Sequence, residues 1–171
     1  MSKIAFIVDS ASGIKNGQYD NVYVLPLIIT INDHTGSVKD YKDGVDIDEV
    51  KVDEAINNRK YDVKTSQASV GELMKMVESI QDEYDLIYVI PIHPKISNSI
   101  NTWNMIKDDY PKICVLPTTD FTCGVIWDVE HLLELAKKGE LTDEVALDYM
   151  ANIYKHRNGI LFVYDLTQLA K

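Results

Sequence analysis

The sequence predicts an α/β protein with three layers (α/β/α), in which helices cover both faces of a mostly parallel central sheet. Short apolar runs rich in β-branched residues alternate with longer segments whose apolar residues recur at helical spacing. Such an alternation of strands and helices is typical of a parallel sheet with crossover helices. The runs expected in the central sheet are residues 3–8, 86–91, 113–116 and 160–164.

The first third of the chain supplies the first strand, two further apolar segments and a short helix. Residues 3–8 have the continuous apolar character of a strand that is buried on both faces. Within residues 22–31, Pro26 has no N–H to donate to a sheet, so we divide this run into a short strand and an edge strand. Residues 38–41 are expected to return as a hairpin partner, and residues 48–57 to form a short helix.

The rest of the chain predicts four more helices. Ser69 and Glu72 have the spacing of a capping box, in which both side chains satisfy N–H groups at the start of a helix. We expect this helix to end near Glu83. The other three helices are expected over residues 98–110, 122–138 and 142–156. Gly139 is suited to end the helix over residues 122–138, because glycine readily adopts left-handed backbone. The apolar positions of the helix over residues 98–110 are Ile100, Trp103, Met105 and Ile106.

Length, charge and cysteine content limit the class of protein. The 171 residues suit one domain, so we expect a single domain over residues 1–171. A formal net charge of −10 disfavours nucleic acid and anionic membrane surfaces as partners, because both repel an acidic protein. No apolar run reaches the roughly 18 residues of a membrane span, and we expect no signal peptide. Cys114 and Cys123 form neither a CxxC pair nor a disulfide framework, which favours the cytoplasm.

Few residues point to catalysis. The four histidines lack metal-ligand spacing and glycine-rich phosphate loops are absent, so we expect neither a metal nor a cofactor. Asp9 follows the first strand, where a carboxylate could carry a phosphoryl group, but Ala11 stands where a second aspartate would be needed. Composition leaves a Ser-His-Asp triad open, although no Gly-x-Ser-x-Gly elbow is present to hold its nucleophile.

Four polar segments are expected at one edge of the sheet. In open α/β sheets, ligands bind outside the carboxyl ends of the strands. The polar segments in this position are residues 9–13, 65–67, 97–99 and 118–120. Thr65 and Ser66 lie just before a helix start, whose unpaired N–H groups stabilise a carboxylate or a phosphate. The sequence therefore predicts an anion site here, with the alternative that these residues only cap helices and cross loops.

Four motifs follow one another along the chain in a recognisable order. They are Lys-Ile-Ala-Phe-Ile-Val-Asp-Ser-Ala-Ser-Gly at 3–13, Val-Leu-Pro-Leu at 24–27, Tyr-Lys-Asp-Gly-Val-Asp-Ile at 41–47 and Lys-Thr-Ser-Gln-Ala-Ser at 64–69. In this order they resemble the DegV family, and the resemblance covers the whole chain. DegV proteins are bacterial fatty-acid-binding proteins, and members serve as the acyl-carrying subunit of fatty acid kinase.

The resemblance also implies which residues bind the ligand. The threonine of the family motif Thr-Ser-Gln-Pro-Ser, which hydrogen-bonds the fatty acid carboxylate, matches Thr65. A serine after the next strand, which contacts the same carboxylate, matches Ser97. Their neighbours Ser66 and Asn98, together with Ser10 after the first strand, are the further candidates. Ala68 stands where the family motif has proline, and Asn98 where it has glycine.

By this resemblance the protein is expected to be a lipid carrier rather than an enzyme. It would bind a long-chain fatty acid through Thr65 and Ser97 and present it to a separate fatty acid kinase subunit. The second domain of the family is expected to be absent after about residue 165. Two alternatives stay open: a truncated interaction or regulatory module that no longer binds lipid, and the first domain of a longer protein. The acyl chain length and the choice between monomer and dimer are also open.

Overall fold

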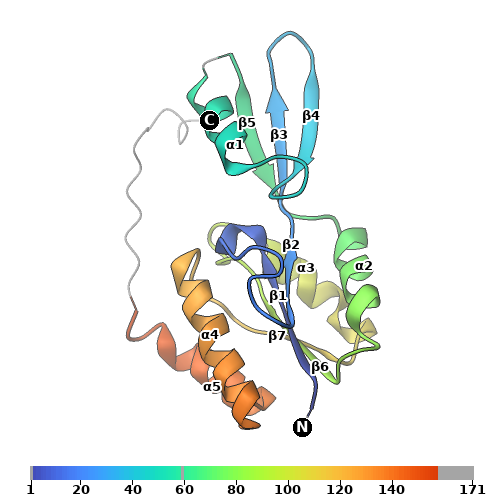
Figure 1. Cartoon of the computed structure of the whole chain (residues 1–171), viewed down its shortest axis with the longest axis vertical. Helices are drawn as coiled ribbons and strands as arrows, with labels where there is room; N and C mark the ends of the chain where they lie inside the picture. Colours follow the sequence, from blue (N-terminus) through green and yellow to red (C-terminus); the bar gives the residue numbers. More distant parts are fainter. Residues whose placement is uncertain (1, 59, 158–171) are drawn as a thin grey trace.

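A four-stranded parallel sheet forms the centre of the protein. The computed structural model describes residues 2–58 and 60–157 (Figure 1). The strands, in spatial order, are β2 (Val22–Leu25), β1 (Ile4–Asp9), β6 (Leu86–Ile90) and β7 (Ile113–Val115). Each neighbouring pair is parallel. The predicted α/β class and the parallel central sheet are therefore confirmed, while the strand predicted over residues 160–164 lies outside the described residues.

Two helical layers cover the sheet, and alternate residues of β1 face one layer or the other. Phe6 and Val8 pack in a core with residues of α4 (Cys123–Lys138) and α5 (Asp143–Ile153). Ala5 and Ile7 pack in a second core with residues of α2 (Val70–Ile80) and α3 (Ser99–Ile106). All six residues of β1 are buried, because a strand with helices on both faces has no side open to water. The three-layer arrangement follows from this double burial (Figure 1).

A second, smaller sheet stands beyond the main one (Figure 1). It is antiparallel, in the order β4 (Val38–Lys42), β3 (Ile28–Asn32) and β5 (Asp62–Ser66). The prediction of an edge strand after Pro26 was wrong, because β3 is the middle strand of this sheet. The predicted hairpin partner is confirmed as β4. A short helix, α1 (Glu49–Asn57), begins at Asp48, whose carboxylate accepts a hydrogen bond from the Lys51 N–H.

Residues 63–67, which the sequence predicts as a short polar loop before a helix, also differ from that prediction. Thr65 and Ser66 belong to strand β5 and not to a loop, since the backbone here pairs with β3 from Ile28 to Asn32. The pairing partner lies more than thirty residues earlier in the chain, and the run Lys64-Thr65-Ser66 lacks the apolar alternation that marks a strand. The strand is stabilised by a hydrogen-bonded ladder rather than by buried side chains.

Two helix ends follow the predicted signals, while α2 ends at Ile80 and α5 at Ile153, earlier than the expected ends near Glu83 and residue 156. Ser69 and Glu72 form the expected capping box at the start of α2. Gly139 ends α4 with φ 72°, the left-handed backbone that glycine adopts without strain. The predicted helix over 98–110 is shorter, because α3 gives way to a 3₁₀ turn, η2 (Lys107–Asp109). Among the described residues, no helix is both long and apolar enough to cross a bilayer.

Helix α3 provides a matched test of the packing. Trp103 is 1% exposed, whereas Met105 is 76% exposed, so Met105 lies outside the apolar stripe in which the sequence placed it. We expect Trp103→Ala to lower the free energy of unfolding by about 3–5 kcal/mol, through lost burial and a residual cavity. Met105→Ala should change it by less than about 0.5 kcal/mol. Urea denaturation of both variants measures this, and equal losses would contradict the assignment of the core face.

Candidate functional site

The candidate residues come from two parts of the fold. Ser10 begins a 3₁₀ turn, η1 (Ser10–Ser12), directly after β1, and Ser97 and Asn98 lie between β6 and α3. These three lie at the carboxyl ends of adjacent parallel strands, as the order of elements predicted. Thr65 and Ser66 instead come from the last two positions of β5 in the small sheet. The candidate site therefore draws on the main sheet and on the small one.

The buried carboxylate of Asp9 fixes the turn that carries Ser97. Asp9 is 4% exposed, and its Oδ2 accepts hydrogen bonds from the Ile92 N–H at 2.8 Å and from the Ser99 hydroxyl at 3.2 Å. The Ser99 N–H in turn donates to Ser97 Oγ at 3.2 Å. Burial raises the pKa of Asp9, against the opposing effect of these two hydrogen bonds. From the sequence, Asp9 was considered only as a possible nucleophile, and its supporting role was missed.

Thr65 and Ser66 offer hydroxyl groups on opposite faces of the small sheet. Successive residues of a strand point to opposite faces, and here Thr65 is paired with Ile29 and Ser66 with Ile28. Both side chains are exposed. Neither hydroxyl hydrogen-bonds to another residue within 2–58 and 60–157. On each face of the strand end, one hydroxyl is thus available to an external acceptor.

The side chain of Gln67 connects the end of β5 to α3. Its Nε2 donates to Thr102 Oγ1 at 2.8 Å, across 35 positions of sequence. Thr102 is 5% exposed and lies in the first two turns of α3, which begins beside Asn98. This contact brings the segment after Thr65 to the helix that starts after Ser97.

Ser10 already has a structural contact. Its Oγ accepts a hydrogen bond from the Leu27 N–H at 3.0 Å. Leu27 lies in the short connection between β2 and β3, where the chain leaves the main sheet for the small one. The bond leaves the hydroxyl hydrogen of Ser10 available to a ligand, and the ligand-binding role of Ser10 stays a prediction.

The fourth predicted segment, residues 118–120, is held by an arginine that the sequence did not single out. Arg157 Nη1 lies 2.6 Å from Asp120 Oδ2 and 2.9 Å from Asp128 Oδ1. The Asp120 carboxyl group packs so closely on Gly124 that a side chain at that position would collide with it. Burial raises the pKa of Asp128, while Arg157 and the Tyr149 hydroxyl act in the opposite direction. One guanidinium thus serves two carboxylates at this edge of the sheet.

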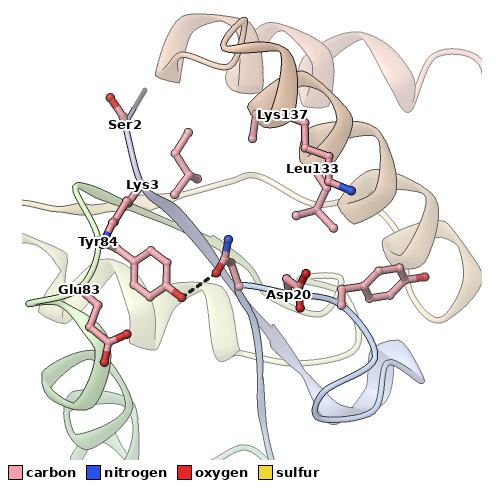
Figure 2. A pocket seen from close by; sticks show the side chains of 11 residues that line it. Ser2, Lys3, Asp20, Glu83, Tyr84, Leu133 and Lys137 are labelled. Carbon is pink, nitrogen blue, oxygen red and sulfur yellow. Dashed lines mark hydrogen bonds between the residues drawn. The ribbon is translucent and has the colours of Figure 1, made fainter.

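A cavity of about 560 Å³ lies at the opposite edge (Figure 2). Its lining includes Lys3, Asn21 and Tyr84, which stand before β1, β2 and β6, so it is at the amino ends of the strands. Tyr84 donates a hydrogen bond to Asn21 Oδ1 at 2.9 Å within it. A six-residue strand spans roughly 20 Å, which separates this cavity from the candidate residues. Across 2–58 and 60–157, no group of three or more His, Cys, Asp or Glu side chains is arranged to hold a metal ion.

Asp9 yields a stability test. Asp9→Ala leaves the part-buried Ile92 N–H and the buried Ser99 hydroxyl without their acceptor, and should lower the free energy of unfolding by about 1–3 kcal/mol. Asp9→Asn keeps one acceptor oxygen and should cost less. The raised pKa means that the folded protein binds the Asp9 proton more tightly than the unfolded chain. The unaltered protein should therefore gain stability relative to Asp9→Asn as the pH falls from neutral towards the ordinary value of 3.8.

Urea denaturation at several pH values measures both effects. The opposite slope with pH, or an Asp9→Ala variant as stable as the unaltered protein, would contradict the role assigned to Asp9.

Comparison with known proteins identifies relatives in sequence and in fold. The DegV family model matches residues 3–171. The DegV domain-containing protein MG450 of Mycoplasma genitalium is 32% identical over 172 residues, which cover 98% of this chain and 58% of that protein. The MG326 homolog of Mycoplasma pneumoniae is 30% identical, over 99% of this chain and 58% of that protein. The chain thus spans a little over half the length of these curated relatives.

Solved structures share the fold. A DegV family protein from Thermus thermophilus, described as binding fatty acid, superimposes with a TM-score of 0.76 at 20% identity, over 90% of this chain and 54% of that one. DegV of Bacillus subtilis, described as a fatty acid binding protein, superimposes with a TM-score of 0.78 at 19% identity. The match covers 91% of this chain and 55% of that one. The solved structures share the fold of this chain, and the family model matches nearly all of its residues. This chain belongs to the DegV family.

Proposed function

We propose that this chain binds the carboxylate of a long-chain fatty acid through the hydroxyl groups of Thr65 and Ser97, as a lipid carrier and not as a catalyst. The observation that carries the proposal is the Gln67–Thr102 hydrogen bond, which joins the segment after Thr65 to the helix beside Ser97. DegV proteins of Thermus thermophilus and Bacillus subtilis are described as binding fatty acids. The proposal extends that property to this chain.

The chemistry of the two hydroxyls suits a carboxylate. A carboxylate only accepts hydrogen bonds, so its partners must be donors. Ser97 Oγ accepts from the Ser99 N–H, an arrangement that leaves the Ser97 hydroxyl hydrogen to donate to a ligand. The Thr65 hydroxyl is exposed and without a partner in the described part of the chain. Hydrogen bonds to an ionised group are about twice as strong as neutral ones, so two such donors would fix the head group.

An apolar side chain beside the candidate residues supports binding of an acyl tail. Ile96, next to Ser97, is 55% exposed. Each methylene removed from water contributes about 0.8 kcal/mol, so the tail would supply much of the affinity. Asn98 and Ser10 would lie beside the head group, whereas the Ser66 side chain, on the opposite face of β5 from Thr65, would point away from it. Handing the bound acid to a separate kinase subunit, which would carry out the phosphoryl transfer, belongs to the same proposal.

A module that binds other macromolecules without lipid is the alternative function. Binding of a fatty acid by the purified chain separates the two. Native mass spectrometry of the protein as purified should reveal a co-purified acid, and a delipidated sample should bind lauric acid saturably. If neither is observed for any acid of C12 to C18, the interaction module is the better description.

Thr65→Ala tests the head-group contact. Loss of one charge-assisted hydrogen bond costs about 1.5–3 kcal/mol, so the affinity for lauric acid should fall roughly 10- to 150-fold by calorimetric titration. Thr35→Ala is the matched control, because Thr35 lies in the β3–β4 turn at the far end of the small sheet (Figure 1) and, within the described ranges, its hydroxyl donates only to Asp33. The control should bind like the unaltered protein. If Thr65→Ala binds lauric acid as tightly as Thr35→Ala, Thr65 is not part of the binding site.

A further inference from the structure

Gln67 occupies an unusual position between the two parts of the candidate site. It lies between β5 and α2, and Ala68 after it is 3% exposed. Its Nε2 donates to Thr102 Oγ1, whose hydroxyl in turn donates weakly to the Asn98 carbonyl oxygen at 3.4 Å. A relay of two hydrogen bonds thus runs from the residue after Ser66 to the backbone of Asn98.

The other half of the Gln67 amide is unsatisfied. Its Oε1 is buried and has no hydrogen-bond partner among the described residues. Buried polar groups are nearly always hydrogen-bonded, because an unpaired one forfeits its bond to water. An apolar side chain of similar length would avoid that cost. Stability of the fold is therefore a poor explanation for a glutamine here, which points to a role in positioning.

We infer that Gln67 is a positioning residue that sets the separation between Thr65 and Ser97 through Thr102. This inference rests on the proposed function, since it concerns the geometry of that same head-group site. The relay acts on both sides: Gln67 lies two residues after Thr65, and Asn98 directly follows Ser97. A carboxylate held by two donors requires both at hydrogen-bond distance at once, and small displacements weaken such bonds steeply.

The relay makes a sharp prediction for Gln67→Met, which keeps the length of the side chain and removes both polar atoms. The loss of the bond to Thr102 and the removal of the unpaired oxygen offset each other, so the midpoint of urea denaturation should stay close to that of the unaltered protein. Affinity for lauric acid should nevertheless fall about 3- to 10-fold, because the two donors are no longer held in register. Affinity for methyl laurate, which has no carboxylate, should change by less than twofold.

Variants of Thr102 test the same relay from the other side. Thr102→Val removes the hydroxyl at nearly constant shape and should weaken lauric acid binding as Gln67→Met does. Thr102→Ser keeps the hydroxyl and should bind lauric acid as the unaltered protein does. The double variant Gln67→Met/Thr102→Val should bind no more than about twofold more weakly than either single one, because both remove one interaction. Gln81→Met, at the far end of α2, is the matched control and should bind normally.

The outcomes separate this inference from the function on which it rests. Lauric acid binding by Gln67→Met within twofold of the unaltered protein, alongside a clear loss in Thr65→Ala, overturns the positioning role and leaves the proposed function standing. Equal losses for lauric acid and methyl laurate also overturn it, since they indicate general damage to the site. Absence of saturable lauric acid binding by the unaltered chain overturns both.

Discussion

Burial of β1 on both faces is the constraint on which the rest of the structure depends. Because alternate side chains of this strand enter two separate cores, apolar residues must fill nearly every position between Ile4 and Val8. Polar groups are therefore confined to the strand ends. Asp9 is the first side chain at the carboxyl end that can carry a charge, and it satisfies its buried oxygen with groups from the neighbouring β6–α3 turn. The candidate site exists where the apolar core stops.

Two polar side chains connect the small antiparallel sheet to the carboxyl ends of the main-sheet strands. Ser10 binds the backbone where the chain departs from β2, and Gln67 binds α3 where the chain returns from β5. An ion pair between Lys42 of β4 and Glu72 of α2, with Nζ and Oε1 2.9 Å apart, adds a third contact. Both side chains are partly open to solvent, so the pair contributes little free energy by itself. The two hydrogen bonds involve part-buried groups and define how the sheets meet.

Sequence reasoning predicted the elements whose signals are local. The capping box at Ser69, the glycine end of α4 and the main-sheet strands predicted over residues 3–8, 86–91 and 113–116 each depend on neighbouring residues, and each was confirmed. It missed β5, because that strand exists only through pairing with a distant β3, and it missed Arg157, whose partner Asp120 lies 37 positions earlier. The polar segments 65–67 and 97–99 were selected by their place at strand ends beside helix starts, and the family resemblance then singled out Thr65 and Ser97 within them.

The adjacent hydroxyls of β5 have a consequence for the evolution of this surface. A one-residue slip in a strand moves every side chain to the opposite face, which ordinarily destroys a binding surface. Here Thr65 and Ser66 carry the same functional group on consecutive positions. A single deletion upstream in the strand would bring Ser66 to the position and face of Thr65, so a hydroxyl would still be presented there. The strand end is thus buffered against shifts of register that would abolish a site built on a single residue.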